Sequence, residues 1–340
     1  MQPKMRTLLL IVFIAITAII AFVIARNQPN KPLPQSLESP VTSPNYVVAS
    51  IAPLADIVRQ IAGDRMQVHT LLPPGASPHT FETTPAELIL LSKAKAFFKI
   101  GWSLEFWADK LVNSLGHDQL RVITVSAGIP TIFSNHHHDD IQPQKHGENV
   151  EHHEHTTTSK NDDEDIEVNP HFWLDPINAM QIANNARDGL IAMDISGREE
   201  YVSNTTAFIQ KLNNLHGEYE QTLSQLRARR FVVFHNAYAY LAQRYKLEII
   251  GIIEPSPGKE PSAKHLATLI DDIKNSHATA VLVEPQFNPR LGEVIAAETG
   301  IKLITIDPLG NPLQPETMTY IGLMKFNLHQ LKSAFDGKIK

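Results

Sequence analysis

Four side chains of types that commonly bind metal ions lie at turns or strand ends predicted from this sequence. His79 follows a Pro-Pro-Gly turn, and His171 lies within the motif NPHFWLDP. His235 and Asp307 each directly follow a short apolar run. In open α/β sheets, ligands bind beyond the carboxyl ends of the strands, so the last two residues are well placed to contact one.

Together, these three histidines and one aspartate would supply three nitrogens and one oxygen, a donor set that suits tetrahedral Zn²⁺. Taken singly, each histidine could instead be a capping or packed residue, and Asp307 could organise a turn. The chain has no cysteine, which excludes disulfides, thiolate metal sites and cysteine nucleophiles. Because imidazoles with a pKa of about 6.5 must lose their protons to bind metal, zinc binding should weaken steeply from about pH 7 to pH 5.

A second group of histidines lies in a strongly acidic segment, 136–167. It contains seven histidines, ten Asp or Glu residues and two lysines, with hardly any apolar residue. Such a segment cannot bury enough surface to offset its chain entropy, so we expect it to be disordered. Mixed imidazoles and carboxylates predict an auxiliary metal-binding loop, and a merely solubilising loop is the alternative. The candidate ligands in the loop are His136, His137, His138, His146, His152, His153 and His155.

The elements that must position the four residues alternate between strands and helices. In the first half, apolar runs and helical spacings predict strands at 46–51, 68–72, 96–100 and 120–125, with helices at 53–63 and 85–94. In the second half, they predict strands at 231–234, 248–253, 280–283 and 302–306, with helices at 236–245, 262–275 and 288–299. This alternation indicates mostly parallel sheets with crossover helices.

Between the two halves, apolar residues over 200–227 recur at spacings of three, four and seven, which predicts one amphipathic helix of about 30 residues. The predicted fold is therefore α/β, with two lobes, each a mostly parallel sheet flanked by helices, joined by one long rigid helix. The expected bounds are 46–190 for the N-terminal lobe, 191–229 for the linking helix and 230–340 for the C-terminal lobe.

The first 45 residues are expected to lie outside this fold. Lys4 and Arg6 precede an apolar run from 8 to 25, which predicts a signal peptide over 1–25 or an uncleaved membrane anchor. Residues 26–45 are rich in Pro, Ser and Asn and predict a flexible tether. Either alternative places the body in the periplasm or elsewhere outside the cytoplasm. The formal net charge of −6 gives no indication of nucleic-acid binding.

Six motifs, in one order along about 46–335, resemble those of the metal-binding solute receptors of ABC transporters (bacterial solute-binding protein family 9), specifically the zinc-uptake, ZnuA-type branch. They are GASPHTFETTP, NPHFWLDP, VVFHNAYAYLAQRY, EPSPGKEPSAKHL, EPQFNP and IDPLG. The resemblance implies two lobes bridged by a rigid helix, with the metal between them. It also implies a monomeric, non-enzymatic receptor that passes Zn²⁺ to the membrane permease of an importer.

The resemblance places the metal ligands on His79, His171, His235 and Asp307. In this family the third position is usually Glu in manganese and iron receptors and His in zinc receptors, and this chain has His235. In some zinc receptors, water or another carboxylate takes the place of the aspartate. The acidic, histidine-rich segment also occurs in the zinc branch.

Three other functions are weighed against a zinc carrier. A manganese or iron receptor of the same family would fit a carboxylate at the third position better than His235. A zinc hydrolase would need an open coordination position and usually a general base, and the sequence contains no HExxH or comparable pairing. An adhesin role is a label often given to relatives, and no residue here tests it.

Overall fold

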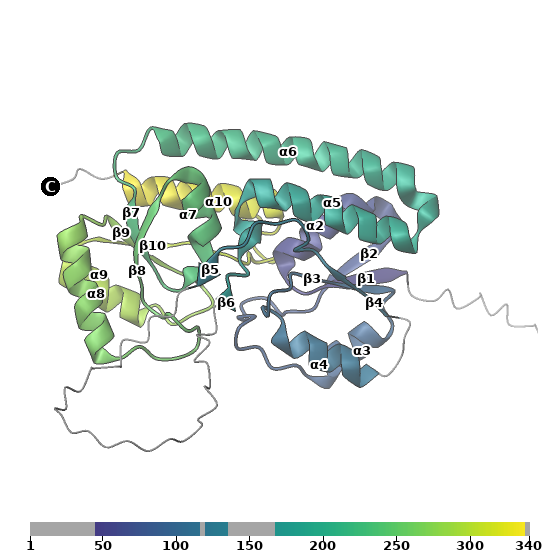
Figure 1. The fold of residues 1–340 in the computed structure, drawn as a ribbon, viewed down its shortest axis with the longest axis horizontal. Coiled ribbons are helices and arrows are strands. Elements are labelled where there is room, and N and C mark those ends of the chain that lie inside the picture. Colours follow the sequence, from purple (N-terminus) through teal and green to yellow (C-terminus); the bar gives the residue numbers. More distant parts are fainter. Residues whose placement is uncertain (1–44, 116–119, 135–166, 337–340) are drawn as a thin grey trace, which may run out of the picture. The chain divides into compact units, whose positions relative to one another are not determined.

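Two four-stranded parallel sheets form the framework of the protein (Figure 1). A computed structural model describes residues 45–115, 120–134 and 167–336, which belong to one compact unit. The N-terminal sheet has the order β2-β1-β3-β4, formed by β1 (Tyr46–Ala49), β2 (Gln67–Thr70), β3 (Ala96–Lys99) and β4 (Arg121–Thr124). The C-terminal sheet has the order β8-β7-β9-β10, formed by β7 (Arg230–Val233), β8 (Glu248–Ile252), β9 (Ala280–Val283) and β10 (Lys302–Thr305).

Helices cover both faces of each sheet, as expected for parallel strands joined by crossover connections. Those of the N-terminal half are α2 (Ala52–Ala62), α3 (Pro85–Ser92), α4 (Phe106–Leu115) and α5 (Pro176–Met193). The long α6 (Arg198–Ser224) leads to α7 (Ala239–Tyr245), α8 (Ala263–Ser276), α9 (Arg290–Thr299) and α10 (Tyr320–Phe335). Figure 1 shows α3 and α4 on one face of the N-terminal sheet and α2 and α5 on the other. The predicted α/β class with two lobes and a long linking helix is confirmed.

The apolar core follows the alternation of side chains along the strands. In β7 and the residue after it, Phe231 and Val233 belong to one buried cluster, while Val232 and Phe234 belong to another, under α8 and α9. The first cluster is continuous with the N-terminal sheet, where it includes Val47. One core therefore extends through both lobes, and it lies on the side covered by α2, α5, α6 and α10.

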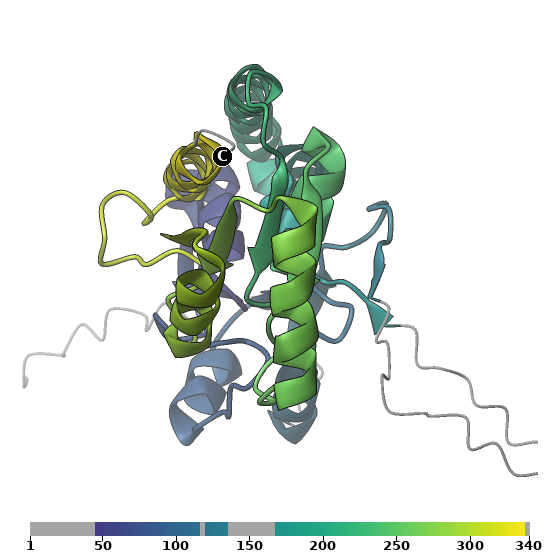
Figure 2. The same ribbon diagram turned by 90° about the vertical axis from the view of Figure 1, so that its left-hand side faces the viewer.

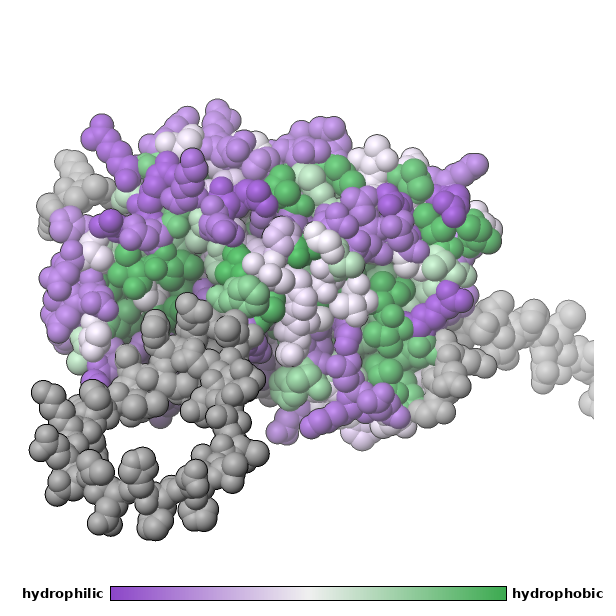
Figure 3. Space-filling model, viewed as in Figure 1, coloured by the Kyte–Doolittle hydropathy of each residue, from purple (hydrophilic) through white to green (hydrophobic). Residues whose placement is uncertain are grey.

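The linking helix α6 is fixed against both lobes. Its buried residues form one stripe: Tyr201, Thr205, Phe208, Leu212, Leu215, Tyr219 and Leu223. Asn204 Nδ2 donates to the Ile61 carbonyl of α2 at 3.0 Å, and the Tyr219 hydroxyl donates to the Met324 carbonyl of α10 at 2.6 Å. Figure 2 shows α6 beside α10, and Figure 3 shows mainly hydrophilic residues along its outer side. Packing of one helix on both lobes is what makes it a stiff connection.

Several element bounds differ from expectation. Residues 191–193 belong to α5 rather than to the linking helix, and a 3₁₀ turn (Ile195–Gly197) separates the two helices. The helix expected at 236–245 begins as a 3₁₀ turn (Asn236–Tyr238) and becomes α-helical only at Ala239. The helices α4, α5 and α10 were not predicted.

The predicted signal segment and most of the acidic loop lie outside the described residues. Of the tether 26–45, only Asn45 is described. Of 136–167, only Glu167 is described, and it lies in the short antiparallel pair of β5 (Phe133–Ser134) with β6 (Glu167–Val168). For Glu167, the expected disorder was therefore wrong, because it pairs with a strand. Among the residues the structure describes, no helix is both long and apolar enough to cross a membrane.

Candidate metal site

His79 is held on an irregular segment between β2 and α3. The segment ends where α3 begins: Thr84 Oγ1 accepts from the Ala86 amide at 3.2 Å, and Glu87 reaches back to the Thr84 amide at 2.7 Å. Before it, the His79 amide donates to Ser77 Oγ at 3.3 Å. The imidazole is half-buried, and burial, followed by the electrostatic effect of His235, lowers the pKa of His79 to about 3.

His171 lies in the segment between β6 and α5. Residues on either side of His171 hydrogen-bond to the C-terminal lobe. Asn169 Nδ2 donates to the Asn236 carbonyl at 2.7 Å, and Trp173 Nε1 donates to the Pro308 carbonyl at 2.8 Å. Asn169 Oδ1 also accepts from the His171 amide at 3.0 Å and from its Nδ1 at 2.9 Å. Since an amide oxygen only accepts, Nδ1 of His171 carries the proton and Nε2 is left with a lone pair.

His235 follows β7 at the carboxyl end of the C-terminal sheet. Its Nδ1 lies 2.8 Å from Oε1 of Glu284, which follows β9 directly. Both side chains are almost fully buried. Strands β7 and β9 are neighbours in the sheet, and between them the strand order reverses, which is where ligands bind in folds of this kind.

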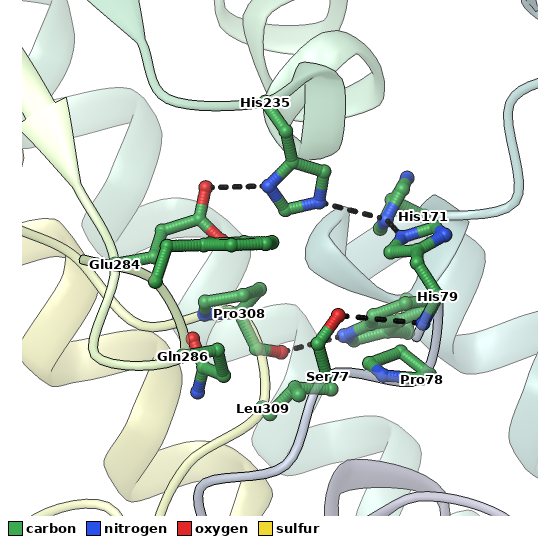
Figure 4. Close-up of a pocket in the computed structure, with 11 residues that line it drawn as sticks. Ser77, Pro78, His79, His171, His235, Glu284, Gln286, Pro308 and Leu309 are labelled. Carbon is green, nitrogen blue, oxygen red and sulfur yellow. Dashed lines mark hydrogen bonds and ion pairs between the residues drawn. The ribbon is translucent and has the colours of Figure 1, made fainter. Parts of the chain in front are cut away.

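The three imidazoles converge on one point (Figure 4). Nε2 of His171 lies 2.9 Å from Nε2 of His79 and 3.1 Å from Nε2 of His235. The potential ligand atoms of the three residues all lie within 4.8 Å of one another. Burial also lowers the pKa of His171 well below its usual value, and the electrostatic effect of the two neighbouring histidines adds to this to a smaller extent. Neutral imidazoles with converging lone pairs are the form of histidine that binds a metal ion.

Asp307 is not part of this group of histidines. It lies beyond β10 and is buried, but its Oδ1 accepts from Gln286 Nε2 and from the Leu309 amide, each at 2.9 Å. The structure therefore brings three of the four predicted ligands together and holds the carboxylate of the fourth in hydrogen bonds of its own. The seven histidines of the acidic segment lie outside the described residues.

The space between the imidazoles is small. It has a volume of about 10 Å³, close to what one water-sized particle occupies. Its walls come from both lobes and are formed by Ser77, Pro78, His79, His171, Trp173, His235, Glu284, Gln286, Phe287, Pro308 and Leu309. A site of this size accepts a bare ion and leaves no room for an organic molecule beside it.

Sequence reasoning missed Glu284 and Gln286 as site residues. Glu284 directly follows the apolar run 280–283, so the strand-end rule that selects His235 applied to it equally. Burial raises the pKa of Glu284, and the neighbouring His235 opposes that change. Its Oε2 and the Oε1 of Gln286 are buried without a hydrogen-bond partner in the described part of the chain.

Comparisons with known proteins agree with this geometry. A family model described as "Zinc-uptake complex component A periplasmic" (ZnuA) matches residues 47–334. The chain is 29% identical over 293 residues to the zinc-binding lipoprotein AdcA of Streptococcus pneumoniae, covering 85% of this chain and 56% of the relative. It thus spans little more than half the length of that relative.

In two further matches, the alignment covers most of this chain and most of the relative. The chain is 29% identical over 292 residues to the high-affinity zinc uptake system protein ZnuA of Bacillus subtilis, covering 85% of this chain and 87% of the relative. A crystal structure of ZnuA superimposes with a TM-score of 0.71 at 28% identity, covering 86% of this chain and 99% of that one.

Proposed function

Since the chain belongs to the ZnuA family of zinc-uptake complex component A proteins, we propose that it is a zinc receptor. In this proposal it captures Zn²⁺ between its two lobes, outside the cytoplasmic membrane, and delivers the ion to the permease of an ABC importer. The relatives reported above carry the names of zinc-binding and zinc-uptake proteins, and none of them carries the name of an enzyme.

The convergence of three Nε2 atoms from both lobes is the observation that carries this proposal. Three neutral nitrogens form most of a tetrahedral zinc shell. Asp307 would complete the shell after exchanging its hydrogen bond from Gln286 for the metal, and water is the alternative fourth ligand. His235 at the third position favours Zn²⁺ over Mn²⁺ or Fe²⁺, which prefer more oxygen donors.

The size of the site argues against the hydrolase alternative. A catalytic zinc must hold a water molecule and a substrate together, whereas the space here is about 10 Å³. The ligands of a carrier, in contrast, need only enclose the ion and later separate. The signal at 1–25, the monomeric state and auxiliary binding by the acidic segment remain parts of the proposal.

Metal content and calorimetry test the proposal directly. Protein purified without added metal should bind one Zn²⁺ tightly, and a variant lacking 136–167 should keep this event and lose only weaker ones. His171→Ala should abolish the tight event, while His329→Ala, which changes an exposed histidine of α10, should not. Tight binding that disappears with 136–167 and survives in His171→Ala would place the primary site in the acidic segment and refute the proposal.

A further inference from the structure

Glu284 is a buried carboxylate beside the three histidines, and the proposed zinc shell does not use it. Only 2% of its surface is exposed. Its Oε1 lies 2.8 Å from Nδ1 of His235, and its Oε2 is buried without a partner in the described part of the chain. A buried carboxylate with one oxygen unsatisfied is costly, which calls for a reason beyond packing.

Glu284 contacts the nitrogen of His235 that does not face the other imidazoles. The two nitrogens of His235 face opposite ways: Nδ1 faces Glu284, and Nε2 faces Nε2 of His171 at 3.1 Å (Figure 4). An ion held by Nε2 lies across the ring from the carboxylate. The hydrogen-bonded connection from Glu284 to the metal therefore runs through His235.

We propose that Glu284 is a positioning residue that holds the proton of His235 on Nδ1 and so keeps Nε2 free for the cation. This inference rests on the proposed zinc-binding function. An ionised carboxylate only accepts hydrogen bonds, so the contact selects the tautomer and sets the ring orientation at once. Asn169 does the same for His171 with a neutral amide oxygen.

The negative charge distinguishes Glu284 from Asn169. Three neutral imidazoles bring no charge to a buried divalent cation, and an uncompensated buried charge is strongly disfavoured. A carboxylate hydrogen-bonded to a ligand makes that ligand a better electron donor and compensates part of the cation's charge. The role of Glu284 therefore includes both orientation and charge.

Two variants test this role. Glu284→Gln keeps the size of the side chain and loses its charge, and Glu284→Met also removes the acceptor. The matched control is Glu105→Gln, since Glu105 is an equally buried carboxylate that does not line the site. Competition with a zinc chelator should show affinity reduced about 10- to 100-fold in both Glu284 variants, with Glu105→Gln within about threefold of wild type.

The tautomer of His235 gives a readout that does not depend on whether the variants fold. Long-range ¹H–¹⁵N NMR of the metal-free wild-type protein should show the ring proton on Nδ1, and a proton on Nε2 would overturn the inference. Wild-type protein that binds no zinc would refute the proposed function. Wild-type protein that binds zinc tightly, with both Glu284 variants binding it equally well, would refute the role of Glu284 alone.

Discussion

The two sheets share one strand order, and each places a buried glutamate beside the residues that follow its first strand. In the N-terminal lobe, Glu105 Oε1 accepts from Ser50 Oγ at 2.6 Å, and Ser50 directly follows β1. In the C-terminal lobe, Glu284 Oε1 pairs with His235, which follows β7. Both contacts lie where the strand order reverses, so the lobes are equivalent in topology but not in chemistry.

The difference lies in what else each carboxylate contacts. Glu105 also accepts from the amides of Ile100 and Gly101, at 2.7 and 3.0 Å, so both of its oxygens are satisfied. It thereby holds a turn in which three successive residues, 101–103, have positive φ angles of 91°, 49° and 61°. Two of these residues are not glycine, and their conformation requires such support. The role of Glu105 is therefore structural.

Glu284, by contrast, has one oxygen satisfied, and its donor is an imidazole whose other nitrogen faces the metal site. A buried carboxylate at this place in the topology therefore stabilises the fold where its donors are backbone amides and a serine hydroxyl. Where its donor is a metal-binding imidazole, as for Glu284, the carboxylate acts on that metal ligand instead.

His235→Glu, in the C-terminal lobe, should have the largest effect on zinc affinity. It removes one nitrogen donor and places a second carboxylate beside Glu284, where two negative charges repel each other. Zinc affinity should fall about 100-fold, since a zinc site of about 10–16 kcal/mol shared by four ligands gives about 3 kcal/mol for each. Mn²⁺ should lose less, because it accepts oxygen donors more readily.

The quantity to measure is the ratio of zinc to manganese affinity, obtained by competition in the same buffer. His329→Glu, at an exposed histidine on α10, is the control for added charge. A ratio for His235→Glu that stays within about threefold of wild type would mean that His235 is not a ligand.

Glu105→Gln, in the N-terminal lobe, should lower the stability of the protein and leave its zinc affinity unchanged. In the variant, the NH₂ group of Gln would face a backbone N–H that donates to the carboxylate in the wild type. The free energy of unfolding of the metal-free protein should therefore fall by about 1–3 kcal/mol. Chemical denaturation checks this value, and the increase in melting temperature caused by zinc should match that of wild type. A Glu105→Gln protein of unchanged stability would contradict the structural role.

Asp307→Asn tests the next strand end along the same sheet and should have a smaller effect. Where zinc takes Oδ1 of Asp307, the loss of a charged ligand is partly offset, because that oxygen gives up its hydrogen bond from Gln286, at a cost of about 1 kcal/mol. Zinc affinity should fall about tenfold. Gln286→Ala should leave Asp307 free to bind and raise affinity by up to about fivefold. A change below about threefold in both variants would indicate water as the fourth ligand.

Much of the fold could be predicted because the strands are short buried runs bounded by turns. Helix α5, which was not predicted, lacks such a clear pattern. The buried face of α5 relies on small residues such as Ala179, Ala183 and Ala186, which give a weak helical pattern. Its start was nevertheless readable, since Asp175 caps the helix and Pro176 opens it.

The candidate site could be predicted only in part from the sequence, for a different reason. Residue type and position at turns and strand ends selected candidates, and the family resemblance placed the ligands on the three histidines that converge. They could not show that the Asp307 carboxylate is already hydrogen-bonded to Gln286, because that contact joins side chains 21 residues apart. Nor could they show how burial changes the protonation of the imidazoles, which depends on the packed surroundings of each ring.

That change in protonation leads to the smallest predicted effect. Ordinary pKa values would give two to three protons released per zinc bound near pH 6, but burial lowers the pKa of His79 to about 3 and that of His171 well below its usual value. Between about pH 6.5 and pH 3 the unfolded chain therefore binds more protons than the folded one, so metal-free stability should fall as the pH falls through this window. At pH 6, zinc meets two imidazoles that are already neutral. Fewer than two protons should therefore be released per zinc bound, since two of the three rings have none to lose.

Calorimetry at pH 6 in two buffers of different ionisation enthalpy measures this number. The variant lacking 136–167 should be used, so that the histidines of the acidic segment do not contribute. The same variant should lose stability steadily from about pH 6.5 to pH 4 when metal-free. When zinc-bound it should lose at least as much, because the unfolded chain takes up the same protons while zinc keeps the imidazoles of the folded chain deprotonated. Release of two or three protons would mean that His79 and His171 titrate as exposed histidines, and that the three rings converge only after zinc arrives.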